Sequence, residues 1–499
     1  MLCYAILSRN EENNTVFAEY RVLGVSVRME IVGRDNERDI LNQCLNSRRP
    51  EFLAVYGRRR VGKTFLIREH CKKYIIFSLS GAVNTPIKRQ LRNFDEALEE
   101  YSGAVMGAAK DWFDAFRLLK KYVQGLRGNK KKAIFIDELP WLATQKSGFL
   151  PALDHFWNNF ASTRGDMLLI ICGSATSWII DNVINNRGGL HNRVTKQMWI
   201  EPFSLRECEL FYKSNEIELN RNQIAELYMI FGGIPYYMNY IEKGMSPEQN
   251  VDKALFEKNA PLKNEYGNLY SALFKNPGHH LRIIESLSKT HSGMTQKELW
   301  EDMSALPGGS LTKALNELEQ CGFIRRCREF TKRKSGQYYQ VTDFFTIFYF
   351  KHMRNQVDQD AKYWQIRSNS GERNAWNGFA FERVCASHIK QIKQKLGIAG
   401  VATEVFAWRS KRATPGVQID LIINRSDGII NLCEMKYTSK PFLIDSEYDL
   451  ALTRKREIFR EETATKKALH ITMVTSNGLA PGSYMGTVQA HVLLEDLYA

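Results

Sequence analysis

The sequence predicts an α/β protein in which a parallel sheet is covered by helices on both faces. Four short apolar runs, at residues 52–56, 75–79, 133–136 and 167–172, indicate buried strands. Helical segments separate these runs, which is the spacing that parallel strands need for their crossover connections. A glycine-rich sequence at the end of the first run is the third observation, because such loops join a strand to a helix in sheets of this kind.

The glycine-rich sequence is FLAVYGRRRVGKTFLI, from Phe52 to Ile67. It fits G-x-x-x-x-G-K-[ST] in full, with a buried strand before it and a helix after it. Backbone N–H groups of such a loop surround phosphate oxygens, Lys63 can reach the β- and γ-phosphates, and the Thr64 hydroxyl can bind Mg²⁺. The arginines occupy variable loop positions, which often face solvent. We expect ATP and Mg²⁺ to be bound by Gly57, Arg58, Arg59, Arg60, Val61, Gly62, Lys63, Thr64 and Phe65.

An acidic pair follows the apolar strand at 133–136. Asp137 stands at the strand end, where it would hold Mg²⁺ mostly through water, and Glu138 would orient and polarise the attacking water. Downstream of a complete phosphate loop, at a distance that leaves room for strands and helices between them, the pair predicts a nucleotide-hydrolysing site.

Three polar residues further on are candidates for the same site. Ser174 follows the strand at 167–172, where a small polar residue can sense the γ-phosphate; a serine that caps the next helix explains it equally well. Arg187 and Arg193 are candidates for an arginine that meets transition-state charge, and Arg193 is preferred.

Composition indicates a chain without membrane spans. The net charge of +14 makes a polyanionic partner plausible. Nine scattered cysteines without a C-x-x-C pair argue against a disulfide framework and a zinc knuckle, and favour a reducing, cytoplasmic location. The most apolar stretch, 167–180, is interrupted by Gly173, Ser174, Thr176 and Ser177, so no membrane partner is expected.

These motifs together resemble a known family. They look like the motifs of the archaeal-type ATPases, relatives of the AAA+ and signal-transducing NTPases. The motifs are YGRRRVGKT, FIDELPW, the Gly-Ser after the fourth strand, GLHNRVT, EPFS and FGGIPYYM. The resemblance covers about residues 29–240. It implies that Gly232, Gly233 and Pro235 lie in a helical lid near the nucleotide, although a Gly-Pro turn between helices explains the same residues.

The pattern changes after about Pro277. Three helical segments and a β-hairpin follow, with Gly322 closing the third helix and Gly336 in the hairpin turn, an order that suits a winged helix. The third helix of such a unit can enter a major groove, or the whole unit can be a protein-contact module. A basic wing for nucleic-acid phosphates, DNA in particular, would consist of Arg325, Arg326, Arg328, Lys332, Arg333 and Lys334.

A second set of chemical residues lies in the last third. Asp420 is on one predicted strand, and Glu434 and Lys436 lie two apart on the next, so that alternation directs both to one face. Such a set is the minimum for metal-assisted phosphodiester hydrolysis. Asp420 and Glu434 would bind Mg²⁺ with the main-chain carbonyl of Met435, and Lys436 would position the water.

This arrangement resembles the PD-(D/E)xK nuclease superfamily, over about residues 374–476. The resemblance implies that Glu382 is the acid on the preceding helix, Asp420 the first metal ligand, and Glu434, Met435 and Lys436 the core. Ile419 stands where the superfamily name has proline. Two strands with surface charges could mimic the motif, and some relatives of nuclease folds only bind.

The sequence thus divides into five segments. They are an N-terminal extension at 1–28, a P-loop core at 29–205, a helical lid at 206–276, a winged helix at 277–355 and a restriction-endonuclease-like α/β domain at 356–499. Residues 1–28 show no clear cap or period, so either Met29 is the original start or the first segment is a loose extension.

Two functions of different classes fit these features. One is an ATP-driven enzyme that cuts DNA in defence, repair or mobile-element biology. The other is a signalling or regulatory ATPase that switches with nucleotide and uses an inert C-terminal domain as a dock. The charged set at Asp420, Glu434 and Lys436 favours the first, and the absence of a helicase motif set favours the second. A homo-oligomer with sites between subunits and a self-contained switch are both compatible with these residues.

Overall fold

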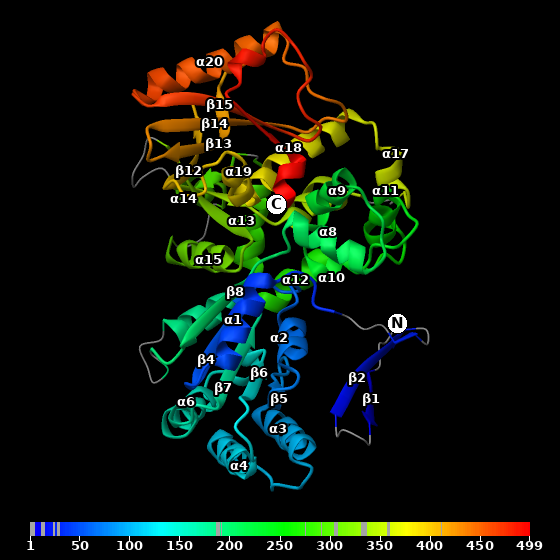
Figure 1. Cartoon of the computed structure of the whole chain (residues 1–499), viewed down its shortest axis with the longest axis vertical. Helices are drawn as coiled ribbons and strands as arrows, with labels where there is room; N and C mark the ends of the chain where they lie inside the picture. The colour runs from blue at the N-terminus through cyan, green and yellow to red at the C-terminus, as the bar shows by residue number, and fades with distance from the viewer. Residues whose placement is uncertain are drawn as a thin grey trace.

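The N-terminal α/β domain contains a five-stranded parallel sheet, as the sequence predicts (Figure 1). In this computed structural model the strand order is β5-β6-β7-β4-β8, and every neighbouring pair is parallel. The strands are β4 (Glu51–Gly57), β5 (Ile75–Ser80), β6 (Lys132–Asp137), β7 (Met167–Gly173) and β8 (Lys196–Ile200). Because β4 lies in the interior of the sheet, the loop after it emerges between β7 and β8.

The structure describes most of the chain. The described residues are 30–185, 190, 192–274, 276–290, 292–303, 308–330, 337–356, 360–410 and 412–499, with the backbone of 5–10, 15–22 and 25–26. Within the N-terminal segment, β1 (Ala5–Asn10), β2 (Thr15–Val22) and β3 (Val25–Ser26) pair antiparallel to one another.

Both faces of the parallel sheet are buried. Alternate residues of β4 enter separate cores: Leu53 and Val55 pack in one, and Phe52 and Ala54 in the other, where the Phe52 ring meets Trp157 at 4.9 Å. This alternation is the two-residue period of a strand. The helices of this domain are α1 (Asp35–Asn46), α2 (Lys63–Cys71), α3 (Ile87–Ser102), α4 (Trp112–Gly125), α5 (Leu139–Leu142), α6 (Phe149–Asn159) and α7 (Thr176–Ile179).

A group of helices follows β8. Its members are α8 (Leu205–Ser214), α9 (Arg221–Phe231), α10 (Pro235–Met238), α11 (Pro247–Val251) and α12 (Glu265–Leu273). The two glycines between α9 and α10 have positive φ, and a Cβ on Gly233 would lie 2.2 Å from the carbonyl oxygen of Phe203. Pro235 then begins α10, a position that needs no backbone N–H.

The next part, here called the helix–hairpin unit, contains three helices and a small sheet ordered β10-β11-β9. Its elements are α13 (Gly278–Ser288), β9 (Met294–Thr295), α14 (Gln296–Met303), α15 (Gly308–Gln320), β10 (Ile324–Arg328) and β11 (Gln337–Val341). The expected turn at Gly336 and the basic residues Lys332, Arg333 and Lys334 lie outside the described residues. Helices α16 (Phe344–Phe348) and α17 (Tyr363–Ile366) lead on to the last domain.

The C-terminal domain has a mixed sheet ordered β12-β13-β14-β15-β16. The first three strands are antiparallel, and β14, β15 and β16 are parallel. Its elements are α18 (Gly371–Ser387), α19 (Ile389–Lys395), β12 (Thr403–Arg409), β13 (Gln418–Arg425), β14 (Ile429–Lys436), α20 (Ser446–Thr463), β15 (Ala468–Thr475) and β16 (Ala490–Leu493).

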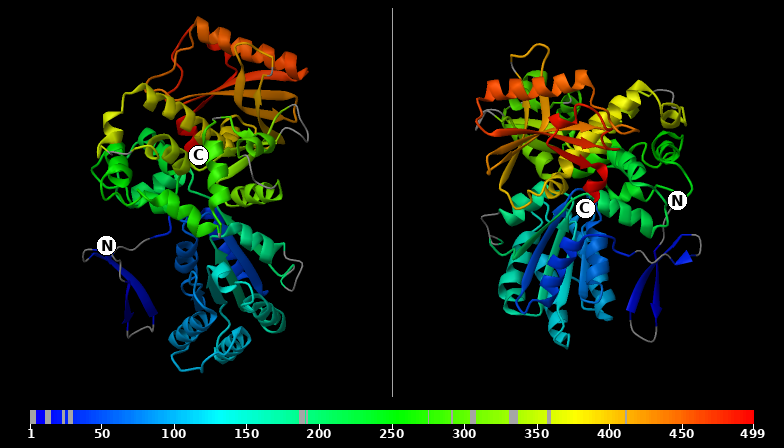
Figure 2. Two further views of the ribbon diagram at one scale, coloured as in Figure 1. Left: turned by 180° about the vertical axis from the view of Figure 1, so that it is seen from behind. Right: turned by 45° about the horizontal axis from the view of Figure 1, so that its top comes forward.

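The two large sheets lie at opposite ends of the molecule (Figures 1 and 2). Helices α8 to α13 lie between them, and one continuous apolar core extends from Leu53 in the first sheet to Cys433 in the second. Over the described residues, no helix combines the length and apolar character needed to cross a membrane.

Gly57, the last residue of β4, is the first glycine of the phosphate loop. It has φ 143°, and a Cβ there would lie 2.4 Å from the carbonyl oxygen of Ile200. We expect Gly57→Ala to lose about 1–3 kcal/mol of stability, because the backbone is strained and β8 must shift. Thermal melting measures this. Gly267→Ala is the control, since nothing lies within 4 Å of its Cβ position in α12, and an unchanged melting temperature for Gly57→Ala would contradict the strain.

Candidate nucleotide and phosphodiester sites

The phosphate loop connects β4 to α2. Gly62 adopts a left-handed conformation at the N-terminus of α2, and Lys63 is the first helical residue. The Lys63 ammonium donates hydrogen bonds to the carbonyl oxygens of Gly57 and Arg58, both at 2.8 Å. Burial lowers the pKa of Lys63. A buried cation held by carbonyl groups is suited to an anionic ligand, because phosphate oxygens would supply the missing negative charge.

Thr64 and Asp137 meet beside this lysine. The Thr64 hydroxyl donates a hydrogen bond to Asp137 Oδ2 at 2.9 Å, and Asp137 is buried at the end of β6. A hydroxyl and a carboxylate that lie side by side offer oxygen ligands, which Mg²⁺ prefers. These two residues therefore fit the metal that the sequence predicts, Thr64 as a ligand and Asp137 through water.

Glu138 is held by Ser174. Its carboxylate accepts hydrogen bonds from Ser174 Oγ at 2.9 Å and from the Ser174 backbone N–H at 3.2 Å. Glu138 itself has φ 47°, an uncommon conformation for a residue with a side chain. The structure thus brings the two residues together, with Ser174 bonded to the glutamate that is expected to orient water.

The arginines of the phosphate loop do not behave as solvent-facing variable positions. Arg58 is 5% exposed, forms a 2.7 Å ion pair with Asp343, and lies over the Phe323 ring at 4.9 Å. Both partners belong to or adjoin the helix–hairpin unit. Arg58 therefore does not face solvent as variable loop positions often do, because the later domain covers this side of the loop, and its role in nucleotide binding stays a prediction.

Arg60 makes an equivalent contact with the helices after β8. Its guanidinium pairs with Glu265 at 2.7 Å and lies 3.9 Å from the Tyr236 ring. Tyr236 follows Pro235 directly, so the Gly-Gly-x-Pro segment reaches the phosphate loop through this ring. Arg59 is half-buried, and Val61 is buried in the core.

Two arginines after β7, Arg187 and Arg193, are the predicted candidates for contact with transition-state charge. Arg193 is exposed, and its backbone N–H donates to the Leu190 carbonyl oxygen at 3.1 Å. Arg187 lies outside the described residues. The role of Arg193 at a transition state stays a prediction.

Asp420 and Glu434 occupy neighbouring strands of the C-terminal sheet. The antiparallel register pairs Leu421 with Cys433, so the next step places Asp420 opposite Glu434. Lys436 Nζ is 3.6 Å from Glu434 Oε1. Strand alternation directs Glu434 and Lys436 to one face, as the sequence predicts.

Two residues that sequence reasoning missed also contact Glu434. Tyr448 OH donates a hydrogen bond to Glu434 Oε1 at 2.9 Å, and Lys455 Nζ to Oε2 at 2.7 Å. Both come from α20, where they are seven residues and about two helical turns apart on one face. That spacing is the one signal that could have pointed to them, but many solvent-exposed helices share it.

Glu382 on α18 belongs to the same electrostatic group. Burial, followed by the charges of Asp420 and Glu434, raises the pKa of Glu382 to about 8. Even so, in the part of the chain that the structure describes, no three His, Cys, Asp or Glu side chains converge closely enough to hold a metal ion. The carboxylates are neighbours, and two of them with a main-chain carbonyl are oxygen donors of the kind that Mg²⁺ prefers.

Three of the predicted nucleic-acid residues, Arg325, Arg326 and Arg328, lie on β10, a strand that contacts β12 of the C-terminal domain. Arg325 donates hydrogen bonds to Gln340 Oε1 at 2.9 and 3.2 Å, and Arg326 pairs with Glu319 at 2.7 Å. Helix α15 contacts α7 of the first domain. One side of this third helix is therefore a protein contact.

A family model matches the region that contains the phosphate loop. Residues 31–241 match the model of an ATPase domain found predominantly in Archaea. An uncharacterized protein of Methanocaldococcus jannaschii, MJECL04, is 26% identical over 415 residues, which cover 81% of this chain and 87% of the relative.

Two solved structures are also similar. The Walker-type ATPase PABY2304 of Pyrococcus abyssi has 16% identity and a TM-score of 0.47, with 64% of this chain and 96% of that chain covered. The Aeropyrum pernix ORC2 protein has 12% identity and a TM-score of 0.41, with coverage of 72% and 96%. With the parallel sheet, the complete phosphate loop and the family match, the N-terminal region is a P-loop ATPase domain.

Glu138 gives the most direct test of the hydrolytic geometry. We expect Glu138→Gln to bind ATP but to hydrolyse it about two to four orders of magnitude more slowly, because the amide cannot accept a proton from water. Steady-state phosphate release and nucleotide binding measure the two effects. Glu69→Gln, an exposed change on α2, should leave both unchanged. Wild-type turnover in Glu138→Gln would remove Glu138 from the mechanism.

The buried pair between Arg58 and Asp343 makes a separate prediction. Asp343→Asn should destabilise the protein by about 3–5 kcal/mol, because Arg58 is left as an uncompensated buried charge. Chemical denaturation measures the loss. Asp445→Asn is the matched control, because Asp445 also caps a helix, α20, but is exposed. Equal effects of the two changes would show that capping, not the ion pair, carries the stability.

Proposed function

We propose that this chain is an ATP-driven DNA enzyme of the cytoplasm, in which the P-loop ATPase controls a winged helix and a Mg²⁺-dependent nuclease domain. The observation that carries the nuclease assignment is the Asp420 and Glu434 pair on adjacent strands, with Lys436 on the same face as Glu434. The helix–hairpin unit is the winged helix, and the C-terminal domain is the PD-(D/E)xK-like unit.

In the ATPase, each residue would have a separate task. Lys63 would exchange its two carbonyl partners for phosphate oxygens, while Thr64 and Asp137 hold Mg²⁺. Glu138 would orient the attacking water, and Ser174, bonded to that carboxylate, would hold it until the γ-phosphate arrives. Bound Mg²⁺ supplies charge neutralisation for the phosphates.

In the nuclease domain, the chain's own groups would position a phosphodiester and water. Asp420, Glu434 and the Met435 carbonyl would hold Mg²⁺, which polarises the phosphate when bound. Lys436 would hold the nucleophilic water, and Glu382 would complete the acidic group. Lys455 and Tyr448 donate hydrogen bonds to Glu434 in this structure. They would then donate hydrogen bonds to substrate or water instead.

The contacts of Arg58 support coupling between the two chemistries. Phe323, over which Arg58 lies, directly precedes β10, the strand that faces the C-terminal domain. A phosphate that draws the loop toward itself would therefore disturb a contact one residue away from that strand. DNA is proposed as the partner because of the excess of basic residues.

A regulatory ATPase with an inert C-terminal domain is the second candidate. It is favoured by the engagement of Glu434 with Lys455 and Tyr448, which satisfies that carboxylate without a metal. In this case the domain would only bind DNA or a protein.

DNA cleavage with the full chain separates the two functions. Labelled single- and double-stranded DNA is incubated with protein and Mg²⁺ or Mn²⁺, with and without ATP. We expect metal-dependent cleavage that Glu434→Gln and Asp420→Ala abolish, because each change removes a metal-binding carboxylate. Glu447→Gln, an exposed change on α20, is the control and should cleave normally. No cleavage by a protein that hydrolyses ATP would favour the regulatory ATPase.

A further inference from the structure

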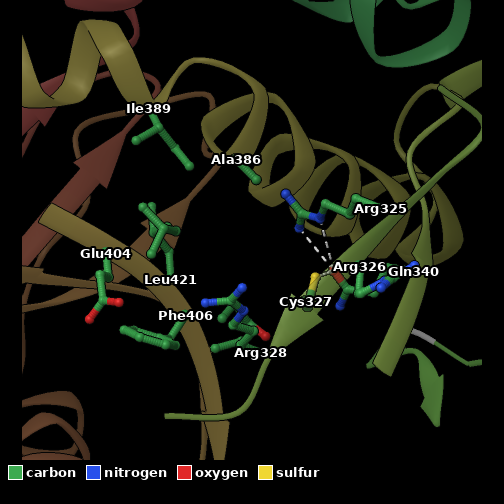
Figure 3. A pocket seen from close by; sticks show the side chains of 13 residues that line it. Arg325, Arg326, Cys327, Arg328, Gln340, Ala386, Ile389, Glu404, Phe406 and Leu421 are labelled. Atoms are coloured by element: carbon green, nitrogen blue, oxygen red, sulfur yellow. Dashed lines mark hydrogen bonds between the residues drawn. The ribbon is translucent and has the colours of Figure 1, made fainter. Parts of the chain in front are cut away.

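A cavity of about 500 Å³ lies between the helix–hairpin unit and the C-terminal domain. One wall comes from β10 and Gln340 of β11, and the other from α18, α19, β12 and β13 (Figure 3). Arg325 and Arg328 extend from β10 toward the second wall, and Asp420 is among the lining residues. The lining of the cavity therefore includes arginines of one unit and a carboxylate of the other.

The two walls are held together by packing. The Phe330 ring, just after β10, meets Phe406 of β12 at 5.3 Å and Phe459 of α20 at 5.1 Å. Glu329 forms a parallel bridge with Ala407, so the chain after β10 pairs with the edge of the C-terminal sheet. The cavity is consequently built into the fold, with a size typical of ligand sites.

The charges on the β10 wall are only partly neutralised. Arg326 is paired with Glu319, whereas Arg325 is bonded to a neutral amide. Arg328 is exposed and has no acidic partner among the described residues. Guanidinium groups without an acidic partner attract phosphate, because they are always charged and form two parallel hydrogen bonds to its oxygens.

We propose that this cavity binds the sugar-phosphate backbone of a DNA strand, with Arg325 and Arg328 holding phosphates that flank the one at Asp420. The inference rests on the proposed nuclease function and specifies its substrate site. The hairpin would thus complete the phosphodiester site of the C-terminal domain, in place of contacting a distant groove. Positioning by phosphate contacts carries no sequence information, so the site would accept DNA of many sequences.

Salt-dependent binding tests the arginines. Fluorescence anisotropy of a labelled oligonucleotide, with a chelator present to prevent cleavage, compares the full chain with Arg328→Gln and with Arg325→Gln. Each variant should bind more weakly, and the slope of log affinity against log salt should fall by about 0.7–0.9 for each phosphate that the variant no longer neutralises. Arg92→Gln, an exposed arginine on α3, should bind as wild type. ATP hydrolysis by each variant confirms that it is folded.

Cys327 supplies a local reporter. It lines the cavity between the two arginines, and it is half-exposed while the other cysteines that the structure describes are buried. Oligonucleotide should slow its alkylation by iodoacetamide, as measured by peptide mass mapping, and Arg328→Gln should reduce this protection. A mononucleotide at the same phosphate concentration should protect little, because it reaches one arginine at a time. Equal protection by the mononucleotide would overturn a strand site in favour of a free-nucleotide site.

DNA binding in the cavity and DNA cleavage at Asp420 can be tested separately. If Arg328→Gln and Arg325→Gln bind DNA with wild-type affinity and slope, or if DNA leaves Cys327 alkylation unchanged, the cavity is not the DNA site. Cleavage that depends on Asp420 would still stand in that case. A wild-type protein that does not bind DNA would overturn both.

Discussion

The ion pair between Arg58 and Asp343 is the contact on which the arrangement of the domains depends. It joins the phosphate loop to the segment after β11, and both side chains are almost completely buried. A charge buried without its partner is strongly unfavourable. The charges of Arg58 and Asp343 therefore compensate each other only when the two domains are packed together. Arg60 and Glu265 repeat this arrangement with the helices after β8, where Tyr237 also bonds to the glutamate at 3.0 Å.

These contacts make the nucleotide site a junction of three parts of the chain. Thr64, Asp137, Glu138 and Ser174 are all positioned by the parallel α/β domain. Asp137 ends β6, Glu138 and Ser174 directly follow β6 and β7, and Thr64 lies in the first turn of α2. Two variable loop residues, Arg58 and Arg60, instead form ion pairs with later parts of the chain. Since Phe323 beside Arg58 continues into β10, and β10 lines the cavity next to Asp420, a single strand separates the two chemical sites.

Local sequence predicted the residues that depend on one element or on one strand end. The phosphate loop, the acidic pair after β6, and the shared face of Glu434 and Lys436 follow from spacing and from the period of a strand. Tyr448 and Lys455 could not be found in this way, because they reach Glu434 only when α20 packs against the sheet. The ion pair of Arg58 could not be found for a similar reason, since its partner Asp343 lies 285 positions further along the chain.

By itself, the sequence determined that this protein has a parallel α/β domain with a complete P-loop and a second charged set near the C-terminus. Those features are local, because the order of strand, glycine loop and helix with a lysine at its start largely determines the conformation of that segment. Only the tertiary structure decided which arginines are buried, which helix completes the contacts of Glu434, and that β10 lies against β12. These depend on burial and charge pairing between distant segments, whose free energies no local pattern encodes.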